Sequence, residues 1–213
     1  MSRPVKFEEV GQPVKFEENG HKYFVDGVRV PNVTSILKVG GFTDFFHVDP
    51  DVLKRSMDFG TAVHKATYFY DLFFGKGLDM AAFDPEIMPY LNAWIKFRKD
   101  SGISFDRSEI EVPLYSESLR IAGTPDRYKK ASGDIWDIKS GGIYSASGLQ
   151  LAGYSMLIEH NFGIKIKHRY IVQLKAEKYK IEECKEVTDR IVFCGAVSGY
   201  FWKLKNGLIK KGE

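Results

Sequence analysis

The first part of the chain alternates apolar and polar residues, the spacing typical of a half-buried β-strand. HKYFVDGVRVPNV (21–33) does so on both sides of Asp26-Gly27, a pair favoured in tight turns, and predicts a β-hairpin. A short helix is expected next, capped by Thr34 or Ser35. Three- and four-residue apolar spacing then predicts longer helices: from Pro50 to about 75, from Asp84-Pro85 to Gly102, over 145–163 and over 187–207.

Strand-like segments lie between these helices. They are FDRSEIEVPLY (105–115), LRIAGTPDRYKK (119–130), GDIWDIKSG (133–141) and the two strands of 166–184. The order of helices, a three-strand meander, a helix, two strands and a helix predicts an α/β fold with a central mixed β-sheet flanked by helices. We expect a single domain over 1–213, with an N-terminal β-hairpin arm over about 1–32.

The arm holds the one internal repeat of the sequence. PVKFEE at residues 4–9 recurs at 13–18. One short duplication does not make a repeat protein, so we expect a spare strand or a loose arm rather than a solenoid.

Composition narrows the class of protein without choosing a function. The 213 residues are 44% apolar and 28% charged, with a formal charge of +3 and basic runs such as Lys165, Lys167 and Arg169. That charge weakly favours a polyanionic partner. Two cysteines are too few for an iron–sulfur cluster or a disulfide scaffold. With no long apolar run, we expect a soluble protein of the cytoplasm, or of the host cytoplasm if it is phage-encoded, that does not bind membranes.

Two predicted strands carry charged residues where core residues would be usual. Asp126 ends one apolar run, and Asp137 and Lys139 interrupt another. Side chains alternate along a strand, so Asp137 and Lys139 share one face while Trp136 and Ile138 share the other. Two carboxylates and an amine brought together are costly unless something pairs them, and aspartate oxygens suit Mg²⁺. The pattern predicts a cation site at these strand ends.

These residues resemble a nuclease family. Pro125-Asp126 followed by Asp137-Ile138-Lys139 is similar to the PD-(D/E)xK signature of metal-dependent nucleases with a restriction-endonuclease-like fold. Gln150 and Tyr154 match the Q-x-x-x-Y element of the RecB-like branch, and His64 in GTAVH matches its upstream histidine. VPNVTSIL (30–37) is similar to the start of phage-type exonucleases and of the mitochondrial genome maintenance exonuclease.

The resemblance implies Mg²⁺- or Mn²⁺-dependent hydrolysis of DNA, usually from an end. It implies that one or two cations are held by His64, Asp126, Asp137 and the Ile138 carbonyl, and that Lys139 is catalytic. Gln150 and Tyr154 would bind the scissile phosphate or orient the lysine. Replication or recombination proteins are the partner class it implies.

Either of two glutamates could supply a further acidic ligand. Glu109 and Glu111 have the same parity in one predicted strand, and Glu111 is favoured because it precedes VPLY as in the relatives. Three readings compete with an exonuclease: an endonuclease of the same fold, a DNA-binding module that has lost activity, and an unrelated α/β domain. The sequence lacks none of the family's ligands or its lysine, which disfavours the inactive module.

Overall fold

The computed structural model describes residues 14–18, 20–43, 48–73 and 77–210. The first PVKFEE copy and the start of the arm lie outside the described residues. The helices are α1 (Val33–Val39), α2 (Pro50–Phe73), α3 (Met88–Ser101), α4 (Ala146–Phe162) and α5 (Asp189–Lys205), with 3₁₀ turns η1 (Met80–Ala82) and η2 (Arg107–Glu109). The strands are β1 (Val14–Glu17), β2 (Lys22–Val25), β3 (Val28–Val30), β4 (Leu114–Ser116), β5 (Ile121–Gly123), β6 (Arg127–Lys129), β7 (Asp134–Lys139), β8 (His168–Lys175) and β9 (Lys178–Glu183).

The strands form a mixed sheet and two smaller antiparallel ones. The largest sheet has the order β6-β7-β8-β9, in which β7 and β8 are parallel and the outer pairs antiparallel. The parallel pair is joined through α4, as parallel strands require a crossover. β1-β2-β3 and β4-β5 are separate sheets. The chain is therefore mixed α/β, as the order of predicted elements indicated.

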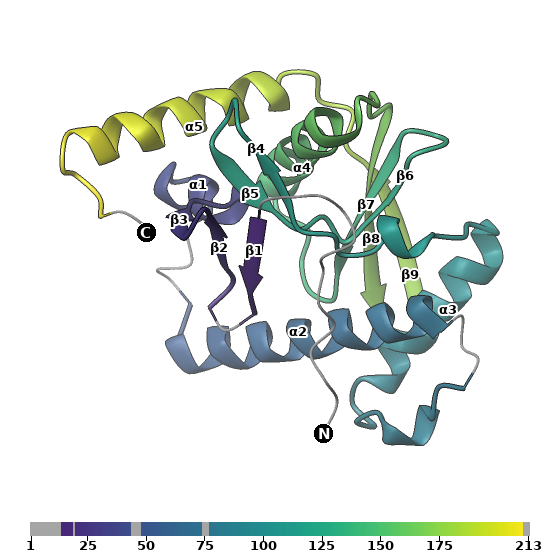
Figure 1. Cartoon of the computed structure of the whole chain (residues 1–213). Coiled ribbons are helices and arrows are strands. Elements are labelled where there is room, and N and C mark those ends of the chain that lie inside the picture. Colours follow the sequence, from purple (N-terminus) through teal and green to yellow (C-terminus); the bar gives the residue numbers. More distant parts are fainter. Residues whose placement is uncertain (1–13, 19, 44–47, 74–76, 211–213) are drawn as a thin grey trace.

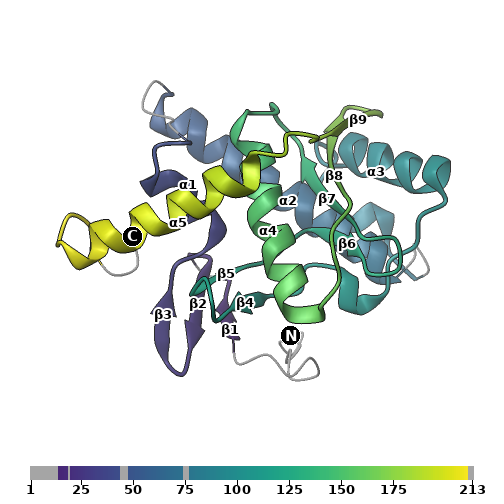
Figure 2. The same ribbon diagram turned by 90° about the horizontal axis from the view of Figure 1, so that it is seen from above.

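Helices cover both faces of the β6–β9 sheet. Viewed from above, α4 lies between α5 and this sheet, and α3 lies beyond it (Figure 2). α2 runs beneath the sheets, below the tip of the β1–β2 hairpin (Figure 1). Strand β7 contributes side chains to the core on both faces of the sheet. Ile135 packs with α4 and α5, while Trp136 and Ile138 pack with α2 and α3. Alternation along one central strand thus separates the two halves of the core.

The predicted helices and the N-terminal hairpin are confirmed. Asp26 and Gly27 form the hairpin turn with φ of 49° and 75°, the positive values that a tight hairpin turn needs. The predicted cap of α1 was wrong: Asn32 is the N-cap, and its side chain accepts the amide hydrogen of Ser35 at 2.8 Å. The Ser35 hydroxyl accepts in turn from the Asn32 amide, so Ser35 completes a capping box from inside the helix.

The third helix begins later than the Asp84-Pro85 signal predicted. Asp84 heads a turn, its side chain accepting from the Glu86 amide, and α3 starts at Met88. A helix begun at Asp84 would hold Pro89 in its interior, where proline lacks an amide hydrogen and clashes with the preceding turn. Starting at Met88 leaves Pro89 in the first turn, where it is tolerated.

The predicted three-strand meander was also wrong. Segment 119–130 is divided at Thr124-Pro125 into β5 and β6, which belong to different sheets, because proline cannot donate to a strand ladder. In segment 105–115 only the last two residues are strand. Asp106 and Glu109 form a capping box around η2 instead, so the shared strand parity of Glu109 and Glu111 does not exist. Among the described residues no helix is long and apolar enough to cross a membrane.

Candidate metal centre

Three candidate ligands from separate segments converge beside β7. His64 comes from α2, Glu111 from the loop between η2 and β4, and Asp126 from the residue before β6. One donor atom from each lies within 4.8 Å of the other two. Nδ1 of His64 is 3.4 Å from Oδ1 of Asp126, and the second oxygen of Asp126 accepts the Ile138 amide hydrogen at 2.7 Å. All three side chains are partly exposed, so solvent and a substrate can reach them.

Backbone geometry places Glu111 in this group. Its φ is 45°, the left-handed region that residues with a Cβ rarely adopt. The conformation is held by the Glu111 amide, which donates to the Asp126 carbonyl at 3.0 Å, and by the bridge between Ile110 and Arg127. Glu109 points elsewhere and pairs with Lys129 at 2.8 Å. Of the two glutamates, the structure brings Glu111 to the site.

Asp137 and Lys139 lie on one face of β7, as the strand alternation predicted. The Lys139 ammonium is 2.8 Å from Oδ2 of Asp137 and donates to the Gln150 side chain at 2.9 Å. The Gln150 amide donates to the Tyr154 hydroxyl at 3.3 Å. These contacts link the strand to α4, where Gln150 and Tyr154 are one turn apart on the same face.

The Tyr154 ring packs against Gly123, which has no side chain to displace it. A Cβ atom on Gly123 would lie 2.8 Å from the Tyr154 ring and 3.0 Å from Leu157. A side chain at Gly123 would therefore push the tyrosine away from Gln150. Ile138, the proposed carbonyl ligand, adjoins the group through its amide, and its side chain is buried in the opposite layer.

The charges of the site shift one another's pKa values. Burial lowers the pKa of His64, but the Asp126 and Glu111 carboxylates outweigh it and raise the value to about 9. Burial raises the pKa of Asp126, but His64 and Lys139 bring it down to about 2. Burial prevails at Asp137 and Glu111 and raises both pKa values, because low polarity disfavours an isolated carboxylate. Without a cation, a protonated His64 is the partner of Asp126.

The residues present suit a divalent cation. Carboxylate oxygens are the usual ligands of Mg²⁺, and an added imidazole nitrogen favours Mn²⁺. Asp137 is 3% exposed, and its Oδ2 atom lies 2.8 Å from the Lys139 ammonium. A buried carboxylate is tolerated when a positive group pairs with it, and Lys139 is such a group here. Asp137 is outside the three-residue group, so the group and Asp137 together form the candidate centre.

A pH dependence follows for the metal-free protein. His64 has a pKa of about 9 when folded and about 6.5 when unfolded, so its pair with Asp126 stabilises the fold fully below pH 6.5 and loses that effect as pH rises through 9. His64→Gln in EDTA should cost on the order of 1 kcal/mol at pH 6, since the partly exposed ring is screened, and almost nothing at pH 10. Urea unfolding at both pH values measures this. His160→Gln, an exposed histidine of α4, is the control, and an equal loss at pH 10 would contradict the expectation.

The N-terminal sheet borders the site. The Tyr23 hydroxyl lies 2.8 Å from the hydroxyl of Thr124, a residue that stands two positions before Asp126. On the other side, Glu18 pairs at 2.6 Å with Lys65, the neighbour of His64. Strand β2, through Tyr23, and the residue after β1, Glu18, are thus fixed to both segments that carry ligands. Sequence reasoning predicted the β2–β3 hairpin and left the second PVKFEE copy open between a spare strand and a loose arm; residues 14–17 form the strand β1. The contacts of this sheet with the ligand segments were not predicted, because nothing in the hairpin pattern shows what the hairpin contacts.

Two buried residues beside the ligands were missed as well. Arg127 and Asp71 are fully buried, and the guanidinium donates to the Asp71 carboxylate at 2.7 Å. A helical signal was present, since Asp71 lies seven residues after His64 and so on the same face of α2. Arg127 directly follows Asp126, but no sequence pattern indicates that it is buried beside the ligands.

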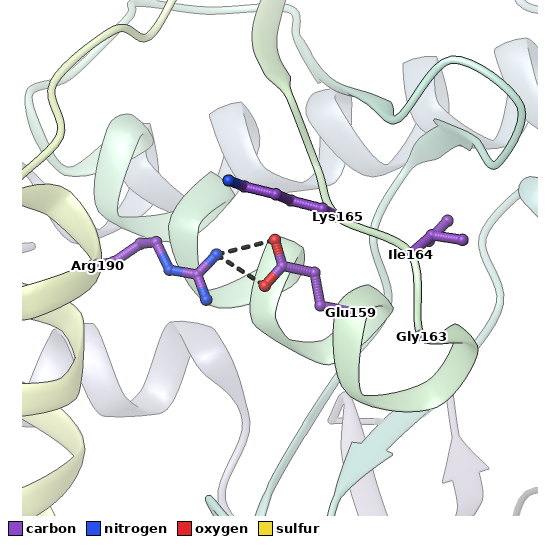
Figure 3. Close-up of a pocket in the computed structure, with 5 residues that line it drawn as sticks. All are labelled: Glu159, Gly163, Ile164, Lys165 and Arg190. Carbon is purple, nitrogen blue, oxygen red and sulfur yellow. Dashed lines mark hydrogen bonds and ion pairs between the residues drawn. The ribbon is translucent and has the colours of Figure 1, made fainter.

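A surface hollow elsewhere is not the candidate site. It lies between the end of α4 and the start of α5 and is lined by Glu159, Gly163, Ile164, Lys165 and Arg190 (Figure 3). The Glu159 carboxylate is occupied by Arg190 at 2.7 Å and by the Ile166 amide. It contains none of the residues that converge near β7, and Glu159 is at the opposite end of α4 from Gln150.

Comparisons with known proteins assign no family. No family model matches the chain, and no curated protein matches it. Among solved structures, the chain is similar to a Eubacterium rectale protein provisionally named an exonuclease, at 12% sequence identity and a TM-score of 0.49. The match covers 87% of this chain and 79% of that one. A likeness this weak assigns neither a family nor an activity.

Proposed function

We propose that the protein is a metal-dependent DNA exonuclease with a restriction-endonuclease-like arrangement of its α/β fold. The observation that carries the proposal is the convergence of His64, Glu111 and Asp126 beside the Asp137–Lys139 face of β7. Chance placement of the PD-(D/E)xK residues would not require the upstream histidine and the lysine to meet at one place. The resemblance of these residues to the nuclease signature supplies the reaction class.

The site residues have two roles: four are proposed ligands of the cation, and Lys139, with Gln150 and Tyr154, is proposed to act on the phosphate. His64, Glu111, Asp126 and Asp137 would hold Mg²⁺ or Mn²⁺, which when bound supplies Lewis-acid stabilisation of charge on a phosphodiester. Lys139 contributes a cation of its own. Its hydrogen bond to Gln150 and its ion pair with Asp137 fix the ammonium at the edge of the ligand group, ready to stabilise negative charge on a phosphate.

Tyr154 and Gln150 act on this lysine. The tyrosine hydroxyl accepts from the Gln150 amide nitrogen, which orients the glutamine carbonyl oxygen toward Lys139. Gln150 and Asp137 together engage two of the three ammonium hydrogens, which leaves the third to meet a substrate. This contact supports the lysine-orienting role of Gln150, and we assign the pair that role in place of direct phosphate binding.

The test uses end-labelled linear DNA and a relaxed closed circle of the same sequence. We expect shortening of the linear molecule with Mg²⁺, equal or faster shortening with Mn²⁺ because of the imidazole ligand, and no product with Ca²⁺ or EDTA. The circle should remain intact.

Each other result assigns a different function. Linearisation of the circle would make the protein an endonuclease. Retardation of DNA in a gel without cleavage under any metal would make it a binding module. Full activity in EDTA would remove the metal centre from the reaction.

A further inference from the structure

Arg127 is a buried side chain beside the candidate ligands that contacts several of their neighbours. It is 0% exposed and bonds to four groups. Its Nε atom donates to Asp71 at 2.7 Å and its Nη2 atom to the Thr67 hydroxyl at 3.4 Å. Its Nη1 atom donates to the Asp126 carbonyl at 2.6 Å and to Oε1 of Glu111 at 3.3 Å. One planar guanidinium thus contacts three separate segments of the chain.

Each of those segments carries a candidate ligand. Thr67 and Asp71 follow His64 on α2 at spacings of three and seven, so all three share one helical face. Holding Thr67 and Asp71 therefore fixes the face of α2 that presents His64. The carbonyl that Arg127 contacts belongs to Asp126, and the same carbonyl accepts the amide hydrogen of Glu111.

Charge explains why this position needs a guanidinium. Asp71 is shared between Arg127 and Arg98, and it also accepts from the Trp94 ring nitrogen at 3.2 Å. The Arg127 guanidinium has a second carboxylate partner besides Asp71, because Glu111 lies 3.3 Å from it. A buried cation is tolerated when it is paired and hydrogen-bonded. Glu111 is drawn inward by this charge while its backbone is held at a positive φ.

We propose that Arg127 is a positioning residue for the cation site: it fixes Glu111 and joins the His64 face of α2 to Asp126, the residue before β6. This inference rests on the proposed metal-dependent function. A lysine at this position keeps the positive charge but has a single nitrogen. That nitrogen can reach Asp71 or Glu111, but it cannot bond to both as the rigid, planar guanidinium does. Arg127→Lys should therefore preserve the fold and loosen the ligands.

Arg98→Lys is the matched control. Arg98 is also a buried arginine paired with Asp71, but it comes from α3 and its Nε atom donates to the Ile103 carbonyl, away from the site. Mn²⁺ titration calorimetry on the metal-free proteins is the measurement. We expect Arg127→Lys to bind Mn²⁺ at least about tenfold more weakly, the size of effect seen when a residue supporting a ligand is changed, and Arg98→Lys to stay within about threefold of wild type.

A double-mutant cycle tests whether Arg127 acts through Glu111. Glu111→Gln should weaken Mn²⁺ binding by itself, and Arg127→Lys should add little in that background, because coupled residues are not additive. Equal Mn²⁺ affinity of Arg127→Lys and wild type would overturn the inference. So would an equal loss in Arg98→Lys, which would mean general damage to the core. If Arg127→Lys does not fold, Thr67→Val removes one acceptor of Arg127, and unchanged Mn²⁺ affinity there overturns the inference.

Failure of the proposed function gives a different pattern. If wild type binds Mn²⁺ but cuts no DNA, the nuclease proposal fails while the comparison of the two arginine variants still decides the role of Arg127. If wild type neither binds Mn²⁺ nor cuts DNA, both are overturned by wild type alone. If wild type does both and Arg127→Lys matches its affinity, only the positioning role is lost.

Discussion

Asp137→Asn should abolish DNA cleavage while leaving the fold and DNA binding in place. The neutral amide keeps the volume of the side chain but holds a hard cation poorly, and the cation supplies several kcal/mol of stabilisation to the reacting phosphate. At about 1.4 kcal/mol per tenfold in rate, the loss should be at least about a hundredfold.

Stability should not fall with it. Burial raises the pKa of Asp137, so its ionised form is more costly in the folded protein than in the unfolded chain above the usual titration range of aspartate. Removing that charge from beside Asp126 also relieves repulsion between two carboxylates. The melting temperature in EDTA should equal or exceed that of wild type.

Three measurements test the Asp137 prediction together: a melting curve, a gel shift without metal, and the end-labelled nuclease assay. DNA binding should persist and weaken as salt rises, because it would come from lysine and arginine contacts with phosphates. Asp134→Asn is the control, since Asp134 begins the same strand but alternates to the other face and is outside the ligand group. A folded Asp137→Asn protein that cuts at near the wild-type rate would show that Asp137 is not a ligand.

The largest effect on stability is expected from Asp71→Asn. The Asp71 side chain is 0% exposed and is the shared partner of Arg98 and Arg127. Replacing its charge by a neutral amide removes the carboxylate that both buried guanidinium groups contact, and leaves Arg127 with the partly exposed Glu111 at 3.3 Å. Removal of one partner of a buried ion pair costs about 3–5 kcal/mol, a large part of the roughly 5–15 kcal/mol that holds a domain folded.

Chemical unfolding in urea measures this loss. Asp100→Asn provides the control, because Asp100 also pairs with a basic residue, Lys96, but at the surface of α3. Exposed pairs contribute about 0–1 kcal/mol, so that variant should unfold near the wild-type midpoint. A loss below 1 kcal/mol in Asp71→Asn would mean that the buried arginines find another partner or water, and that Asp71 does not hold α2 to the sheet.

Local sequence patterns were enough to place most of the elements. Helical spacing predicted α2, α4 and α5, and the Asp26-Gly27 pair predicted the first hairpin, because helix and turn formation depends on residues that are close in the chain. The errors fell where two local signals competed. Pro89 delayed the start of α3, Pro125 divided one predicted strand into two, and a capping box turned the start of another into a 3₁₀ turn.

The sequence by itself also indicated the chemistry of β7. Alternation along a strand was sufficient to put Asp137 and Lys139 on one face and Trp136 on the other, since that rule depends only on the backbone. The four-residue spacing of Gln150 and Tyr154 placed them on one face of a helix for the same reason. Such rules act within an element and do not depend on the rest of the molecule.

Only the tertiary structure decided which of these groups meet. Between His64, which lies within α2, and Asp126 the chain forms α3, two 3₁₀ turns and the strands β4 and β5, and no local rule gives the distance between the two residues. Glu111 reaches the site through a left-handed backbone held by the Asp126 carbonyl, and Arg127 through a charge balance with Asp71. Contacts of this kind depend on burial and on charges from distant segments, because a buried ionic group is stable only when its partners are brought to it by the fold.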